Sequence, residues 1–183
     1  MEASVSDEPL AKIQAATAAE ICLRYDVPMD ARALLRDAMT PREFLEVLAG
    51  AKRYVQGIDF LAHALPPREG IWWGSLCLQH ARGEALYPAE RAAWVAALRW
   101  VIQPTGENQA AAQAPAGAAG VMSPAGALAW AAVGGIEPGP YGPAATVARA
   151  VKLASSQCSA VGIIEAQRSY LELGIGVAEG KYA

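Results

Sequence analysis

Apolar residues recur three and four positions apart along most of the chain, which is the spacing of one face of an α-helix. The clearest example is the group Phe44, Leu45, Val47 and Leu48. Short stretches of alternating apolar and polar residues, which would indicate strands, are absent. The pattern predicts helices over about 10–25, 30–39, 40–50, 54–65, 67–82, 88–102, 123–134, 143–156 and 163–179. We therefore expect an all-α fold.

Proline marks the start of many of these helices. In the first turn, the missing proline N–H costs no hydrogen bond. Thr40 and Glu43 also have the spacing of a capping box, and Thr17 with Glu20 has the same spacing, which favours a start of the first helix near residue 17. The prolines expected at or near helix starts are Pro41, Pro67, Pro88, Pro124 and Pro143.

The helix that begins at Pro67 is apolar on nearly every side. Ile71, Trp72 and Trp73 point in three different directions, and a helix that is apolar all round is buried among others. At least one of the two tryptophans should therefore be almost fully buried. The sequence has no fixed-period repeat, which argues against a solenoid. It predicts a compact bundle of stacked helical hairpins around a buried, Trp-containing central helix.

The composition changes after the first six helices. Residues 108–136 contain no charged side chain and are mostly alanine and glycine. Pro115, Pro124 and several glycines argue against a membrane span there. We expect residues 1–9 to be a disordered lead and residues 10–183 to form a single domain, with a flexible Ala/Gly linker at about 107–122. The later helices have one apolar face each and should belong to the same core.

Composition and charge narrow the class of protein. With 183 residues and 54% apolar residues, the chain is long and apolar enough to be globular with one core. A net charge of -3 and the lack of a basic cluster argue against binding to nucleic acid. The three cysteines are scattered and suggest no disulfide framework, which is typical of a reducing compartment. Because the amino terminus does not resemble a signal peptide, we expect a cytoplasmic protein.

The sequence shows no constellation of catalytic residues. His63 and His80 are the only histidines, and no carboxylate or cysteine stands near them at the spacing of metal ligands. Ser75 lies within a predicted helix rather than at a strand-to-helix turn, and Cys77 should be buried and inert. We therefore expect no catalytic residue, no metal and no other cofactor.

A candidate binding site lies at the start of the central helix. Arg68 and Glu69 are expected to be exposed there, beside Trp72 and Trp73, and His63 ends the preceding helix. These five residues are predicted to form a polar rim around an aromatic site for a ligand or a partner. The alternative is that the first turn is merely solvated, with Glu69 favoured by the helix dipole and His63 bordering the core.

The sequence from Phe60 to Glu69, FLAHALPPRE, is followed by Trp72 and Trp73, and this motif resembles an uncharacterised family of bacterial proteins of about this length. Some members are encoded near type VI secretion genes. The similarity covers roughly residues 17–179 and includes the closing segment 170–174. It implies an accessory role in the cytoplasm and supplies no catalytic residues.

These observations lead to two main hypotheses. The first is a non-enzymatic helical adaptor or chaperone-like protein that binds another protein, such as a secreted effector or a component of type VI secretion. The alternative is a small enzyme with a pocket near His63, Glu69 and Trp73. Self-association into a homo-oligomer stays open as a third hypothesis. Neither nucleic acid nor a membrane span is expected to be involved.

Overall fold

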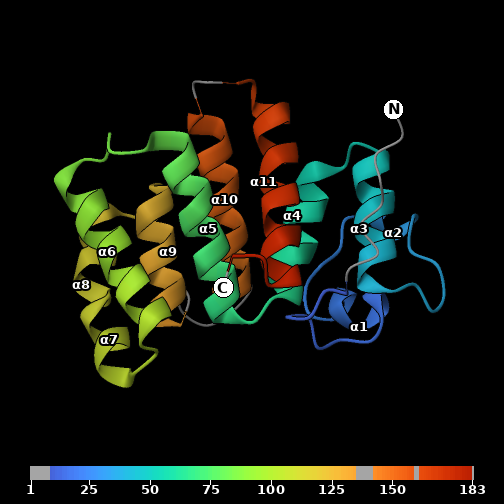
Figure 1. The fold of residues 1–183 in the computed structure, drawn as a ribbon, viewed down its shortest axis with the longest axis horizontal. Coiled ribbons are helices and arrows are strands. Elements are labelled where there is room, and N and C mark those ends of the chain that lie inside the picture. The colour runs from blue at the N-terminus through green and yellow to red at the C-terminus, as the bar shows by residue number, and fades with distance from the viewer. Residues whose placement is uncertain (1–8, 135–141, 159–160, 183) are drawn as a thin grey trace.

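A computed structural model describes residues 9–134, 142–158 and 161–182. Every regular element in these residues is an α-helix, which confirms the predicted all-α fold (Figure 1). Within the same residues, no helix has both the length and the apolar character needed to cross a membrane. The helices are α1 (Ala18–Cys22), α2 (Met29–Arg32), α3 (Pro41–Gly50), α4 (Tyr54–Ala64), α5 (Pro67–Arg82), α6 (Pro88–Ile102), α7 (Gly106–Ala111), α8 (Gln113–Ala119), α9 (Pro124–Val133), α10 (Pro143–Gln157) and α11 (Ile163–Glu179).

Local sequence signals account for many of the helix starts. Each of the five prolines that we predicted at or near a helix start is the first residue of a helix, in α3, α5, α6, α9 and α10. At the start of α3, the Glu43 backbone N–H donates to the Thr40 hydroxyl at 3.2 Å, and the Thr40 N–H donates to the Glu43 carboxylate at 2.7 Å. The predicted capping box is therefore present.

The helices pack as hairpins around α5 and α10. Among consecutive helices, the most extensive contacts are in the pairs α3–α4, α5–α6, α8–α9, α9–α10 and α10–α11. α5 packs against α6, α9, α10 and α11, while α10 packs against α4, α5, α9 and α11. Figure 1 shows α1–α3 at one end of the molecule and α6–α8 at the other. The predicted central helix, α5, thus shares the centre with α10.

Trp73 lies at the middle of this core. Its side chain is 0% exposed, which confirms that one of the two tryptophans is buried. Its indole N–H donates to the Tyr170 carbonyl of α11 at 2.7 Å, so the buried polar atom has a partner. The ring lies against Gly174, where an added Cβ would be 2.5 Å from Trp73 Cε2 and 2.6 Å from Leu61 Cδ2. Helices α4, α5 and α11 therefore meet at a point that has no room for a larger residue.

The amino-terminal part contains less helix than the pattern predicts. α1 spans only Ala18–Cys22, with Thr17 as its N-cap, and the helix predicted over 30–39 is reduced to the four residues of α2. Ala38 has φ 57°, which a continuing helix does not allow. The carbonyl of the next residue, Met39, accepts a hydrogen bond from Ala18 N at 2.8 Å. Met39 thus contacts the start of α1 instead of ending a helix.

The stretch about 107–122, predicted as a flexible Ala/Gly linker, is largely helical in the structure. It contains most of α7 and all of α8. Alanine is the strongest helix former, and Pro115 lies in the first turn of α8, where its missing N–H has no intrahelical partner to lose. Ala112 and Ala116 are fully buried, and α8 packs against α6 and α9. The predicted disordered lead falls almost entirely on residues 1–8, which lie outside the described residues.

Replacing each of the two adjacent tryptophans tests the central position of α5. Trp73→Ala should lower the free energy of unfolding by about 3–5 kcal/mol, because it opens a large cavity in the core. Trp72→Ala should cost clearly less, since that side chain is only partly buried. Chemical denaturation of both variants measures the difference. If both unfolded at the wild-type midpoint, the central position of α5 would be refuted.

Candidate functional site

The structure distributes the five predicted binding residues over three places. Arg68, Glu69 and Trp72 line one pocket at the amino end of α5. His63 lines a second cavity, beside α10. Trp73 belongs to the core described above and lines neither of them. The predicted site therefore divides into two separate candidate sites.

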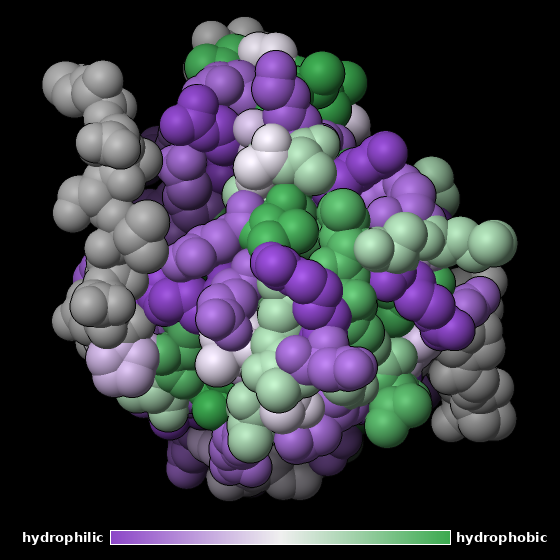
Figure 2. Space-filling view, turned by 90° about the vertical axis from the view of Figure 1, so that its right-hand side faces the viewer, coloured by the Kyte–Doolittle hydropathy of each residue, from purple (hydrophilic) through white to green (hydrophobic). Residues whose placement is uncertain are grey.

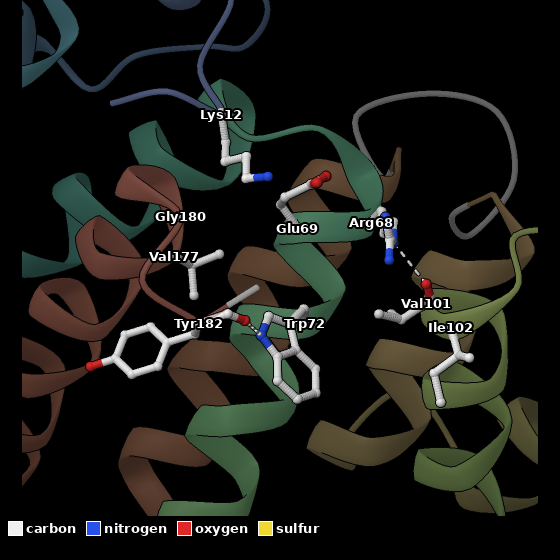
Figure 3. Close-up of a pocket in the computed structure, with 9 residues that line it drawn as sticks. All are labelled: Lys12, Arg68, Glu69, Trp72, Val101, Ile102, Val177, Gly180 and Tyr182. Atoms are coloured by element: carbon white, nitrogen blue, oxygen red, sulfur yellow. Dashed lines mark hydrogen bonds between the residues drawn. The ribbon is translucent and has the colours of Figure 1, made fainter. Parts of the chain in front are cut away.

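The first site, which we call the Trp72 pocket, has a volume of about 260 Å³. It lies where the start of α5 meets the carboxyl ends of α6 and α11, and the segment before α1 closes one side (Figure 3). Its floor and walls are mostly apolar, while charged side chains lie at its rim. The lining residues are Lys12, Arg68, Glu69, Trp72, Val101, Ile102, Val177, Gly180 and Tyr182.

Two long-range hydrogen bonds hold the walls of the Trp72 pocket together. Arg68 Nε donates to the Val101 carbonyl at 2.8 Å, which ties α5 to the end of α6. Trp72 Nε1 donates to the Tyr182 carbonyl at 2.6 Å, which ties α5 to the residues after α11 (Figure 3). Both bonds satisfy groups at the edge of the pocket. They leave the face of the Trp72 ring and the apolar side chains to contact a ligand.

The rim of the pocket contains two charged groups that have no side-chain partner among the residues that the structure describes. Within the described residues, neither the Lys12 ammonium nor the Glu69 carboxylate makes an ion pair or a side-chain hydrogen bond. In Figure 3 both side chains project toward the same space above Trp72. Across the pocket, at the end of α6, Ile102 is 76% exposed (Figure 3). The arrangement combines an exposed apolar surface with charges of both signs, and it can bind an apolar side chain together with its polar backbone.

The residues after α11 are fixed by a turn and an ion-pair network. Gly180, with φ 88°, ends α11 in the left-handed conformation that glycine adopts without strain. Glu179 forms ion pairs with Arg42 at 2.6 Å and Lys181 at 2.8 Å. Burial alone would raise the pKa of the Glu179 carboxyl, but these two partners outweigh burial and lower the pKa below its ordinary value. The network positions Tyr182 as a wall of the pocket.

The second site, which we call the His63 cavity, is larger, at about 620 Å³. The His63 ring stacks on Tyr25, with centroids 4.3 Å apart and an angle of 15° between the planes. His63 Nδ1 lies 2.8 Å from the Asp59 carbonyl oxygen. Because a carbonyl can only accept, Nδ1 is the nitrogen that holds the proton. Burial lowers the pKa of His63 below its ordinary value of 6.5, so the ring is neutral at pH 7.

The residues of the enzyme hypothesis do not converge. Glu69 lines the Trp72 pocket, His63 lines the other cavity, and Trp73 is enclosed in the core. Burial raises the pKa of the Cys77 thiol well above its ordinary value, which makes it a poor nucleophile. In the parts of the chain that the structure describes, no group of three or more His, Cys, Asp or Glu side chains is placed to hold a metal ion.

Some residues of the two sites carry no clear signal in the sequence. Lys12 and Tyr182 reach the Trp72 pocket from opposite ends of the chain, and only tertiary packing brings them there. Tyr25 meets His63 in the same way. For Ile102, by contrast, the sequence does carry a signal. It ends the apolar pattern of α6, and an apolar residue at the last position of a helix is easily left exposed.

The fold and its pockets define an all-α protein with two candidate ligand sites and no assigned chemistry. The chain belongs to a family described as a family of unknown function (DUF6931), whose model matches residues 44–178. This match confirms that the FLAHALPPRE segment and Trp72–Trp73 belong to an uncharacterised family. Among curated proteins no match is found, and no solved structure matches the chain. Lys12 and Tyr182 lie outside the matched residues, whereas most of the Trp72 pocket lies within them.

His63 should make the protein less stable in mild acid. The pKa of this histidine is lowered in the folded state, so the unfolded chain binds more protons below about pH 6.5, and stability falls as the pH drops through that range. His63→Phe keeps a ring against Tyr25 but removes the titrating group. The loss of unfolding free energy between about pH 7.5 and 5.5 should therefore be smaller in this variant.

The matched control is His80→Phe, at the exposed histidine near the end of α5. Urea denaturation at both pH values measures all three proteins. An equal acid-induced loss in the wild type and in His63→Phe would contradict the assignment to His63.

Proposed function

We propose that this protein is a non-enzymatic helical adaptor or chaperone-like protein that binds another protein through the Trp72 pocket. The motif resemblance described above supports a bacterial, cytoplasmic setting and an accessory role in type VI secretion. The partner would be an effector or a component of that system. The binding residues are Arg68, Glu69 and Trp72, together with Ile102 from α6.

The observation that carries the proposal is the combination of an apolar pocket with a partly charged rim. Protein interfaces commonly have a buried apolar centre in which tryptophan is enriched, surrounded by polar residues that exclude water. The Trp72 pocket has this arrangement, since Trp72, Val101, Ile102 and Val177 form the apolar part. A partner's apolar side chain would cover Ile102, which is otherwise largely in contact with water.

The pocket is held rigid before any partner binds. Arg68 is fixed by the Val101 carbonyl and Trp72 by the Tyr182 carbonyl, so these two side chains need little ordering on binding. Rigid binding residues lose less conformational entropy on association. The hydrogen bonds thus favour a pre-formed binding surface on the adaptor.

A charge placed in the pocket should abolish binding without unfolding the protein. Ile102→Glu puts a carboxylate into the apolar part of the pocket, where a buried partner would leave it unpaired. Leu23→Glu is the matched control, because Leu23 is 88% exposed and lines none of the described pockets. Tagged proteins expressed in the native host, purified under gentle conditions and analysed by quantitative mass spectrometry, should give a partner that is retained by the wild type and Leu23→Glu.

The same partner should be depleted at least about tenfold with Ile102→Glu, as expected when a central interface residue is changed. Thermal denaturation should show that both variants remain folded. A partner that is recovered equally with all three proteins would contradict the pocket as the binding site. Recovery of only the untagged, natural copy of this protein would instead indicate a homo-oligomer.

A further inference from the structure

We propose that the His63 cavity binds a small molecule that bears a phosphate group, a function separate from protein binding at the Trp72 pocket. The cavity lies between α4, the amino-terminal half of α10 and the segment that follows α1. Three cationic side chains line it: Arg24, Arg149 and Lys152. Arg149 and Lys152 both lie on α10, and Arg24 comes from a distant part of the chain, so the fold adds its charge to theirs.

Two of these cations have no carboxylate partner in the described part of the chain. Within the described residues, neither Arg24 nor Arg149 forms an ion pair. Arg24 Nη1 donates to the His63 carbonyl at 2.9 Å, and Arg149 Nη2 contacts the Met122 sulfur at 2.8 Å. Neither contact neutralises a guanidinium, and each leaves further N–H groups available.

The carboxylates of the cavity do not cancel this charge. Asp59 is already neutralised by Lys152, whose Nζ lies 2.6 Å from Asp59 Oδ1. The other carboxylate in the described lining is Asp26, and its single negative charge is smaller than the combined charge of Arg24 and Arg149. Even with His63 neutral at pH 7, the described lining has a net positive charge, because three cations are present with two carboxylates. The amino end of α10 forms part of the wall, and its dipole has the same sign.

Two guanidiniums without a carboxylate partner among the described residues suit a doubly charged oxyanion such as phosphate. The planar fork of arginine matches phosphate oxygens with two parallel hydrogen bonds, and such charge-assisted bonds are stronger than neutral ones. Like charges in one cavity repel each other, and a bound anion relieves that repulsion. A doubly charged phosphate group bound between the two arginines would compensate both.

The size and wall of the cavity indicate a ligand larger than the phosphate ion. A volume of about 620 Å³ falls in the range of small-molecule sites, roughly 300–1,000 Å³. The stacked rings of Tyr25 and His63 provide a flat wall for the carbon skeleton of such a ligand. We therefore expect a phosphate monoester with an attached carbon or ring system.

Phosphate binding can be measured on the full chain with two probes, inorganic phosphate and phenyl phosphate. Both should raise the melting temperature relative to chloride at equal ionic strength, because a ligand that binds the folded state stabilises it. In isothermal titration calorimetry, Arg24→Gln combined with Arg149→Gln should weaken binding of both probes by about tenfold or more.

The control combines Arg36→Gln with Arg99→Gln, which removes two exposed arginines outside the described lining of the cavity and leaves the net charge equal to that of the test variant. Arg149→Lys keeps the charge but not the fork, and it should weaken binding even if the double variant is unstable. The proposal would be overturned if neither probe bound the wild type, or if the control lost binding as much as the test variant. Because Ile102→Glu lies outside this cavity, its effect on partner recovery reports on the proposed function separately.

Discussion

The close contact between Trp73 and Gly174 is the constraint on which the rest of the fold depends. A tryptophan ring from α5 fills the space that a side chain on α11 would occupy, and Leu61 of α4 reaches the same point. The indole N–H is satisfied by the Tyr170 carbonyl of α11, so the ring is held in direction as well as in depth. Helix α11, which is distant in the chain, is thereby fixed relative to the consecutive helices α4 and α5.

This contact also fixes the positions of the two candidate sites. Consecutive residues of an α-helix point about 100° apart, so burying Trp73 directs Trp72 away from it, toward the carboxyl end of α11. There its indole N–H meets Tyr182 and the Trp72 pocket forms. Leu61 places α4 in the same core, which leaves His63 on the side that faces Tyr25 and α10. Protein binding and phosphate binding are therefore proposed on two sides of one rigid centre.

The fold was largely predictable because its signals are local. A capping box such as Thr40 with Glu43, or a proline in a first turn, acts within a few residues and does not depend on the rest of the chain. The burial of at least one of Trp72 and Trp73 could be predicted for a similar reason, since a helix that is apolar on nearly every side must be enclosed, but the sequence did not show which of the two it is. Helices α7 and α8 escaped prediction because alanine and glycine give no apolar period, although alanine itself favours helix.

The candidate sites were only partly predictable because they depend on distant contacts. Arg68, Glu69 and Trp72 follow one another along α5 and could be grouped from the sequence. The sequence could not show that His63 and Glu69 lie in different sites. Their placement depends on how Leu65–Pro66 turn the chain between α4 and α5. Tyr182 and Tyr25 are brought to the two sites only by packing of the chain ends, which no periodicity reports.

The most direct test is the unfolding free energy of Gly174→Ala compared with Gly117→Ala. An added methyl group at Gly174 would collide with Trp73 and Leu61, while nothing lies within 4 Å of the position where it would stand at Gly117, in α8. We expect a loss of about 1–3 kcal/mol for Gly174→Ala. We expect a gain of about 0.5–1 kcal/mol for Gly117→Ala, because alanine favours the helix. Equal stability of the two variants would contradict the central role of the Trp73–Gly174 contact.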